Sequence, residues 1–234
     1  MFKNIYLIIK ISIYFKPIHL AVTLTDQHNL VILNTQLHPQ RVDHLNTLHD
    51  HALIMALPSE SQGYFENHGI TVHYSGIGKV NAAFKAYDVI QRTGCKTLIN
   101  FGTAGSSSFP RHALVEIGQF VQRDMDVSPL GFPVGTTPMD DEHPAEIKLD
   151  RYFLELPHAV CGTGDSFETG LPKVQCQVVD MEGYALAKVC KKLGVRLISV
   201  KYITDGADDS AHLDWQDNLK VGAEKLLQLY QQHF

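Results

Sequence analysis

The sequence lacks the cysteine and histidine patterns that mark metal sites and disulfide scaffolds. Its four cysteines form neither a CxxC motif nor a cluster with histidine: Cys95, Cys161, Cys176 and Cys190. None of the thirteen histidines belongs to an HExxH motif. These absences exclude the common zinc motifs and are typical of a reduced cytoplasmic protein with buried thiols. We therefore expect no metal and no cofactor.

The chain also lacks a strong charge of either sign and a long uninterrupted apolar run. Its formal charge is −5 and no stretch is rich in lysine and arginine, so we expect neither nucleic acid nor a membrane as a partner. Residues 1–20 are apolar, but Lys10 interrupts them and Lys16 and Pro17 end the run. The segment is too short to span a membrane and has no clear signal-peptide cleavage site. A short strand or hairpin and a poorly ordered extension both fit it, and we expect a cytoplasmic protein.

From residue 51 onward, short apolar segments alternate with helical ones. Strands are predicted over residues 51–57, 71–74, 96–101, 117–122, 159–162, 177–180 and 195–203, and helices over 79–93, 181–193 and 214–232. The helix at 79–93 is expected to be amphipathic, because Val80, Ala83, Phe84, Tyr87 and Ile90 recur at three- and four-residue spacing. The alternation predicts a single α/β domain with a mostly parallel, twisted sheet flanked by helices.

Four polar residues follow the predicted strands, where ligands bind in sheets of this kind. They are Glu60, Thr103, Glu182 and Asp205. Each has a simpler explanation when taken alone: a solvated helix start for Glu60, a tight turn for the GTAG segment at 102–105, and a loop or capping carboxylate for Asp205. Glu182 is the least ordinary of the four, because it follows an apolar strand and opens a helix. Only the combination points to a function.

Five segments carry that combination: SGIGKVNAA (75–83), NFGTAGS (100–106), TGDSF (163–167), VVDMEGYALA (178–187) and ITDGAD (203–208). In order and approximate spacing the chain resembles the nucleoside phosphorylase superfamily, and in detail its 5′-methylthioadenosine/S-adenosylhomocysteine nucleosidases, which act in methionine salvage. The resemblance covers residues 51–232 and implies a nucleoside phosphorylase-like α/β domain, residues 51–234, around a mixed, partly closed sheet. Residues 1–50 lie outside it and form an N-terminal extension of unknown role.

The resemblance implies two catalytic residues. Asp205 matches the aspartate that protonates the purine at N7, and Glu60 matches the carboxylate that activates the attacking water. Breaking an N-glycosidic bond needs both, because the purine leaves as an anion and water is a poor nucleophile. A nucleoside substrate and water are therefore the expected partners of the site.

The same resemblance implies the substrate-binding residues. Glu182 would hold the ribose hydroxyls, Met181 would pack beneath the sugar, and Phe167 would stack on the base. Thr103, with Ala104 beside it, stands where the family usually has serine. Two further positions depart from the family pattern: Asp180 replaces a glutamate, and Lys201 stands where many members carry arginine.

Hydrolysis is favoured over phosphorolysis by what a bound phosphate would require. Phosphorylases of the superfamily have an arginine two residues before the glycine of the GTAG segment, and here that residue is Asn100. Their glycine-aspartate-proline loop after the first strand is also absent. A phosphate-dependent purine nucleoside phosphorylase, a non-catalytic nucleoside-binding protein and a hydrolase of another adenine nucleoside or nucleotide remain as alternatives.

Residues 123–138 (RDMDVSPLGFPVGTTP) resemble the family loop that lines the 5′-substituent pocket of a neighbouring subunit. Leu130, Phe132 and Pro138 fall at the contacting positions, so the resemblance implies a homodimer. A surface loop made irregular by its prolines is the alternative. Apolar groups left exposed on such a loop also favour a partner. The stretch 60–75 is shorter than in the family, which leaves the 5′-substituent undefined.

Overall fold

The computed structural model describes residues 6–13, 16–24, 30–33, 50–140, 145–167, 172–205 and 211–234. Contacts divide the chain into two units, Met1–Thr47 and Leu48–Phe234. The first unit contains an antiparallel sheet in the order β1-β2-β3, formed by Tyr6–Ile13, Lys16–Leu24 and Leu30–Leu33. Strands β1 and β2 pair as in a hairpin, one of the alternatives for this region, with Tyr6 opposite Thr23 and Ile13 opposite Lys16; residues 1–5 and 14–15 lie outside the described ranges.

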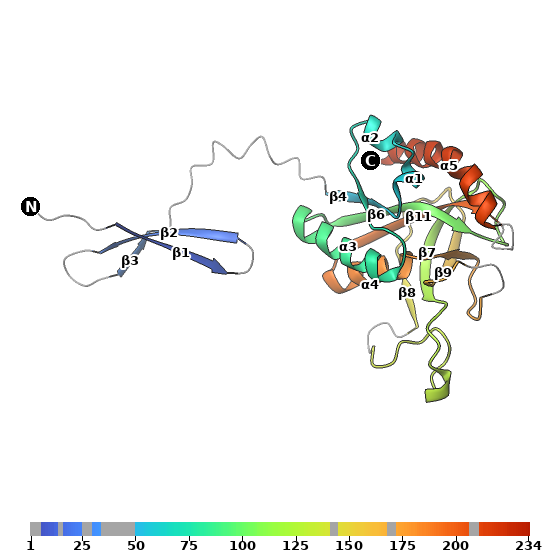
Figure 1. Ribbon diagram of the computed structural model, residues 1–234, viewed down its shortest axis with the longest axis horizontal. Coiled ribbons are helices and arrows are strands. Elements are labelled where there is room, and N and C mark those ends of the chain that lie inside the picture. Colours follow the sequence, from blue (N-terminus) through green and yellow to red (C-terminus); the bar gives the residue numbers. More distant parts are fainter. Residues whose placement is uncertain are drawn as a thin grey trace, which may run out of the picture. The chain divides into compact units, whose positions relative to one another are not determined.

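The second unit alternates strands with helices (Figure 1). Its strands are β4 (His51–Met55), β5 (Val72–Tyr74), β6 (Thr97–Gly105), β7 (Leu114–Gln122), β8 (Glu146–Lys148), β9 (His158–Thr163), β10 (Val178–Asp180) and β11 (Arg196–Asp205). Its helices are α1 (Pro58–Ser61), α2 (Tyr64–Asn67), α3 (Lys79–Thr93), α4 (Gly183–Leu193), α5 (Ala211–His233) and the 3₁₀ turn η2 (Ser128–Leu130). No helix in the described ranges is long and apolar enough to cross a membrane.

The strands of the second unit form one mixed sheet in the order β10-β9-β7-β11-β6-β4-β5, with β8 added to β7. Strands β5, β4, β6 and β11 run parallel, and β7 is antiparallel to β11. Beyond β7, strands β9 and β10 continue in parallel. Val179 of β10 also pairs with Gly105 of β6, so the sheet partly closes on itself. The predicted fold class, a mixed and mostly parallel sheet flanked by helices, is confirmed.

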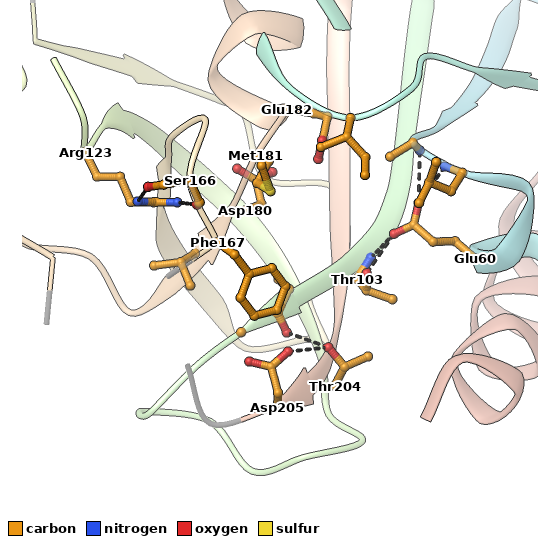
Figure 2. A pocket seen from close by; sticks show the side chains of 16 residues that line it. Glu60, Thr103, Arg123, Ser166, Phe167, Asp180, Met181, Glu182, Thr204 and Asp205 are labelled. Carbon is orange, nitrogen blue, oxygen red and sulfur yellow. Dashed lines mark hydrogen bonds between the residues drawn. The ribbon is translucent and has the colours of Figure 1, made fainter. Parts of the chain in front are cut away.

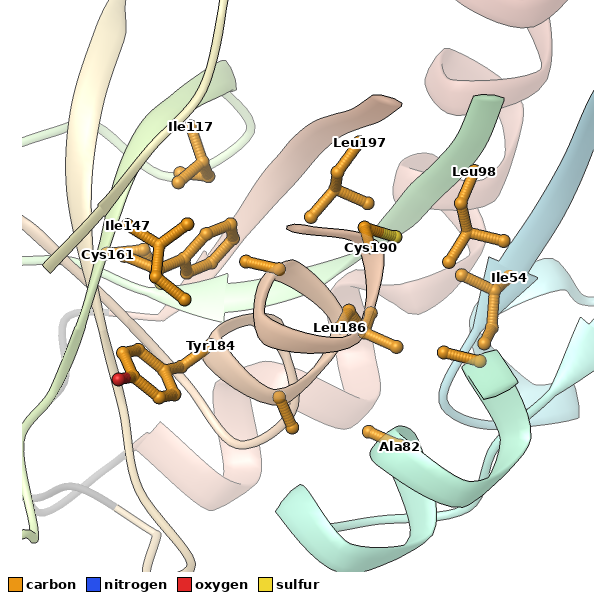
Figure 3. Packing of buried hydrophobic residues seen from close by; sticks show 14 of the residues in the cluster. Ile54, Ala82, Leu98, Ile117, Ile147, Cys161, Tyr184, Leu186, Cys190 and Leu197 are labelled. Carbon is orange, nitrogen blue, oxygen red and sulfur yellow. The ribbon is translucent and has the colours of Figure 1, made fainter. Parts of the chain in front are cut away.

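Two apolar clusters cover the two faces of the sheet. Neighbouring residues of a strand point to opposite faces, and Leu98 and Ile99 of β6 accordingly belong to different clusters. On the Leu98 face, α3 and α4 pack through residues such as Ala82 and Leu186 (Figure 3). On the other face, α5 packs through Leu226. The sheet edge at the carboxyl ends of the parallel strands is left for polar side chains.

Two sequence-based expectations about local structure are wrong. The GTAG segment, expected as a loop, lies within β6, because β6 and β11 pair in parallel as far as Gly105 and Asp205. Thr204 and Asp205 are likewise strand residues, and residues 206–210 of the predicted loop lie outside the described ranges. Strand β8, only three residues long, was not predicted.

Helix α3 has the predicted bounds, but three large residues of its apolar stripe are exposed. It runs from Lys79 to Thr93 and is capped by Gly94, whose φ of 68° is the left-handed conformation that glycine favours at a helix end. Val80, Phe84 and Tyr87 are 80%, 75% and 52% exposed. Two members of the stripe do pack against the core, Ile90 buried and Ala83 partly buried, together with residues outside the stripe: Ala82, Ala86 and Val89. Periodicity identifies an apolar stripe, but here its three largest exposed members, Val80, Phe84 and Tyr87, lie away from the chain's own core.

Candidate active site

A cavity of about 380 Å³ opens at the carboxyl ends of β4, β6, β10 and β11, where the sheet topology predicts a ligand. Figure 2 shows side chains from these strand ends pointing into it. Its lining includes eight of the predicted site residues: Glu60, Thr103, Ala104, Phe167, Asp180, Met181, Glu182 and Asp205. Residues up to 145 positions apart in the chain are thus brought together in one cavity.

Glu60 is held in place by four hydrogen bonds. It lies on α1, which begins at Pro58 directly after β4, and its side chain turns back toward the strand. Its Oε2 accepts from the backbone amides of Ala56 at 3.0 Å and Leu57 at 3.1 Å. Its Oε1 accepts from the amide of Thr103 at 2.8 Å and from the Thr103 hydroxyl at 2.7 Å (Figure 2). Glu60 is only 5% exposed, which contradicts the alternative of a solvated helix start.

Glu182 is a buried carboxyl at the start of α4. Its Oε1 accepts a hydrogen bond from the amide of Gly78 at 2.9 Å. Burial, and then the negative charge of Asp180, raises the pKa of Glu182 from 4.5 to about 7. This carboxyl therefore changes its charge near neutral pH, in a place where it faces the cavity. A group of this kind in a cavity is typical of a functional site.

Asp180 lies in the cavity wall, but its carboxylate is occupied by neighbouring groups. Oδ1 accepts from the Thr163 hydroxyl at 2.6 Å. Oδ2 accepts from the Gly183 amide at 2.9 Å and forms an ion pair with Lys201 Nζ at 2.8 Å. Burial alone would lower the pKa of Lys201, but Asp180, Cys161 and Glu182 together outweigh burial and raise that pKa, with Asp180 contributing most. The pair therefore supports the segment that carries Met181 and Glu182.

Asp205 ends β11 and is almost fully buried. Its Oδ2 accepts a hydrogen bond from the Thr204 hydroxyl at 2.8 Å, which fixes the orientation of the carboxyl group (Figure 2). The amide of Ser106 binds the backbone carbonyl of Asp205 at 3.1 Å. A buried carboxyl that ends a strand and lines a cavity differs from the loop or helix-capping carboxylate that was the alternative.

The three residues predicted to line the 5′-pocket do not line the cavity of their own chain. Leu130 is 73% exposed on η2, and Phe132 and Pro138 are half-buried. The segment between β7 and β8 that carries them extends away from the sheet (Figure 1). Their predicted contact with a neighbouring subunit is a property of an assembly, and it stays a prediction.

Sequence reasoning missed several residues of the cavity, of which Arg123 is the most notable. It directly follows β7, is buried, and lines the cavity. Its Nη1 donates to Ser166 Oγ at 3.0 Å, and its Nη2 donates to the carbonyl oxygens of Gly164, at 3.3 Å, and Ser166. The available signal was an arginine at the end of a strand, inside a segment already singled out. Leu57, Ile77, Ser166 and Thr204 also line the cavity.

The cavity offers little to a phosphate dianion. Asn100 is buried within the sheet, where it accepts a hydrogen bond from Ser199 Oγ at 2.9 Å, and it is not part of the lining. Among the described lining residues, Arg123 is the one cation, and its guanidinium is bound to the segment 164–166. Within the described part of the chain, no group of three or more His, Cys, Asp or Glu residues could hold a metal ion.

Comparison with known proteins agrees with the motifs. Residues 59–232 match the family model described as the Phosphorylase superfamily. The chain is 30% identical over 191 residues to a 5′-methylthioadenosine/S-adenosylhomocysteine nucleosidase from Marinomonas sp. (strain MWYL1), covering 73% of this chain and 82% of that protein. It is 28% identical over 180 residues to an aminodeoxyfutalosine nucleosidase from Helicobacter pylori (strain J99), covering 69% of this chain and 78% of the relative.

Solved structures share the fold. A crystal structure of 5′-methylthioadenosine/S-adenosylhomocysteine nucleosidase from Helicobacter pylori with butyl-thio-DADMe-Immucillin-A superposes with a TM-score of 0.68 at 23% identity. The match covers 78% of this chain and 97% of that one. A putative nucleosidase of the same name from Francisella philomiragia superposes with a TM-score of 0.70 at 21% identity and covers 77% and 98% of the two chains. With a family model spanning most of its length and a relative at 30% identity, the chain belongs to the phosphorylase superfamily, as its motifs predicted.

Proposed function

We propose that this protein is a nucleosidase that hydrolyses the N-glycosidic bond of an adenine nucleoside of the 5′-methylthioadenosine or S-adenosylhomocysteine type. The products are free adenine and the ribose. The observation that carries the proposal is one cavity into which three buried carboxyl groups project from three strand ends, those of Glu60, Glu182 and Asp205. The nucleosidase names of the relatives support it.

Asp205 and Glu60 carry out the two proton transfers of the reaction. As the C1′–N9 bond breaks, its electron pair goes to the purine, and Asp205 gives a proton to N7. Water attacks C1′ and gives its proton to Glu60 as the new C–O bond forms. The four donors around Glu60 keep its carboxylate fixed, so the base need not reorganise during the attack.

The remaining lining residues hold the two parts of the nucleoside. Glu182 accepts hydrogen bonds from the ribose hydroxyls, and the thioether of Met181 packs beneath the sugar. Phe167, which lines the cavity and is 48% exposed, stacks on the adenine ring. An aromatic ring stacked on a base contributes about 1–3 kcal/mol. The cavity therefore separates a base end from a sugar end.

Hydrolysis is favoured over phosphorolysis because a water molecule, unlike a phosphate dianion, needs no cluster of cations to bind it. Phosphate binding normally uses several cations and free amides. The lining residues described here provide the guanidinium of Arg123, already bound to Ser166, while Glu60 would repel an anion near the sugar. A second substrate class remains open at the 5′ end, because some relatives are named aminodeoxyfutalosine nucleosidases.

We further propose a homodimer in the cytoplasm, acting in methionine salvage. Large apolar side chains are exposed at Leu130 and along the apolar stripe of α3, where they are Val80, Phe84 and Tyr87. Ile77, three residues before Val80, is 49% exposed and also lines the cavity. The stripe therefore begins beside the cavity. Contiguous exposed apolar groups of this kind mark an interaction surface. A second copy seated there would cover the stripe beside the site.

Adenine release tests the substrate assignment. Methylthioadenosine, adenosylhomocysteine, aminodeoxyfutalosine and adenosine should be compared at equal concentration, with free adenine measured by chromatography. We expect turnover of at least one of the first three, and weaker turnover of adenosine, whose 5′-hydroxyl offers little to an apolar pocket. No adenine from any of them would contradict the proposed activity. Release from adenosine alone would contradict the proposed 5′-substituent class.

A further inference from the structure

Three charged residues meet beside the cavity without being part of its lining. Lys79 is the first residue of α3, and Asp124 and Asp165 follow the ends of β7 and β9. Lys79 Nζ lies 2.6 Å from Asp124 Oδ1 and 3.6 Å from Asp165 Oδ2. The amide of Asp165 donates to Asp124 Oδ2 at 2.8 Å. Three segments that are distant in sequence are thus tied at one point, which we call the Lys79 junction.

The junction includes the N-terminus of α3, where neighbouring amides hold two carboxylates. The amide of Lys79 donates to Asp165 Oδ1 at 2.7 Å, and the amide of Gly78 donates to Glu182 Oε1 at 2.9 Å. The positive end of a helix dipole favours carboxylates in these positions. Gly78 has φ of 95°, and a Cβ there would lie 3.1 Å from Asp165 Oδ1. The sugar-side carboxyl and the segment of Asp165 are therefore anchored on the same helix end.

Residues 164–167 form the segment that the junction holds from outside. Ser166 and Phe167 of this segment line the cavity. On the cavity side, Arg123 binds the carbonyl of Gly164 and both oxygens of Ser166. Phe167, proposed to stack on the base, directly follows these anchored residues. Its position therefore depends on the two anchors.

The Lys79–Asp124 pair of the junction is partly removed from solvent. The side chains of Lys79 and Asp124 are 18% and 28% exposed, that of Asp165 is 47% exposed, and Lys148 in its pair with Glu146 on β8 is 73% exposed. Burial would raise the pKa of Asp124, but Lys79 and the amide of Asp165 outweigh it and lower that pKa. Asp124 thus stays ionised and paired with Lys79. A partly buried pair is screened less by salt than an exposed one.

We propose that Lys79, Asp124 and Asp165 are positioning residues that hold the segment 164–167, and with it Phe167, in place over the base. The inference rests on the proposed function, because it assumes a purine at Phe167. The junction acts on binding of the base and not on bond breaking, since Asp205 and Glu60 belong to other strand ends. Weakening it should raise KM and the Kd of adenine while kcat changes little.

The test compares Lys79→Met and Asp165→Asn with Lys79→Arg, which keeps the charge, and with Lys148→Met as a matched control on the exposed pair of β8. If the segment loses its hold, part of the stacking on Phe167 is lost, so KM and the calorimetric Kd of adenine should rise about five- to tenfold. We expect kcat within twofold of the unmodified protein, near-normal values for Lys79→Arg, and no change in Lys148→Met.

Two readouts separate the possible failures. An unmodified protein that releases no adenine would contradict the proposed function itself. An active unmodified protein whose Lys79→Met and Asp165→Asn variants keep their KM and adenine Kd would overturn the junction. A fall in kcat at unchanged adenine Kd would also overturn it. Thermal unfolding shows whether each variant folds. If Lys79→Met does not fold, Asp165→Asn provides the test, because asparagine can still accept a hydrogen bond from the Lys79 amide.

Discussion

Replacing Glu60 by glutamine should reduce both turnover and stability. All four groups bound to its carboxylate donate hydrogen bonds: three backbone amides, of Ala56, Leu57 and Thr103, and the Thr103 hydroxyl. A glutamine must turn its NH₂ group toward one pair of these donors. The Thr103 hydroxyl can rotate to accept, but the Thr103 amide cannot. At least one buried donor therefore loses its partner.

The structure sets the size of the two effects. An unsatisfied buried amide costs about 1–3 kcal/mol, and in a domain of this size each kcal/mol lowers Tm by about 2–4 °C. The Tm of Glu60→Gln should therefore fall by roughly 2–12 °C. Loss of the general base should lower kcat by about 10²–10⁴-fold. The catalytic effect is larger than the structural one and must be measured well below the new Tm.

The assay pairs steady-state adenine release with the affinity for a non-hydrolysable nucleoside analogue. We expect a large loss of kcat with little change in analogue affinity, because Asp205, Glu182 and Phe167 remain. Glu66→Gln is the matched control, since Glu66 lies nearby on α2 but is exposed and outside the cavity lining. A Glu60→Gln variant with near-native kcat would refute the assignment. Loss of analogue binding together with turnover would instead indicate direct contact with the sugar.

Three further predictions concern other parts of the site. Asp205→Asn removes the proton donor but can still accept from Thr204, so kcat should fall by about 10²–10⁴-fold with Tm nearly unchanged; turnover near the native rate would show that Asp205 is not the acid. Folding raises the pKa of Glu182 from 4.5 to about 7, so between these pH values the unfolded state binds fewer protons and stability falls as pH rises. Thermal unfolding of Glu182→Gln should show a shallower decline over that window, and parallel curves would contradict the shift. Phe132→Ala should weaken binding of nucleosides with a bulky 5′-group more than binding of adenine; a fully active monomer in light scattering would exclude a shared site.

The sequence could predict which side chains meet at the site because the fold follows from local pattern. The alternation of apolar strands and helices indicates a parallel sheet, and the carboxyl ends of parallel strands meet at one edge. Glu60 and Glu182 follow such strands, Thr103 lies near the end of β6, Asp205 ends β11, and all four line the cavity. The motifs were needed to choose these four from among many strand-end residues.

What could not be predicted depends on contacts between distant segments. The spacing of Val80, Phe84 and Tyr87 defines a stripe on α3, but not whether that stripe meets the core of its own chain. The buried Ala82 and Ala86 allow α3 to approach α4 closely, and a periodic pattern gives small residues little weight. Arg123 binds a segment some forty residues away, and the position of Arg123 at the end of a strand does not predict which segment it binds.

The sugar product formed without phosphate tests the central claim most directly. Purified protein, dialysed into phosphate-free buffer, should be incubated with methylthioadenosine, and the sugar identified by mass spectrometry beside free adenine. If Glu60 directs water to C1′, adenine and free methylthioribose should appear in equal amounts, and added phosphate should change neither the rate nor the product. Turnover that depends strictly on phosphate and yields a sugar 1-phosphate would contradict hydrolysis.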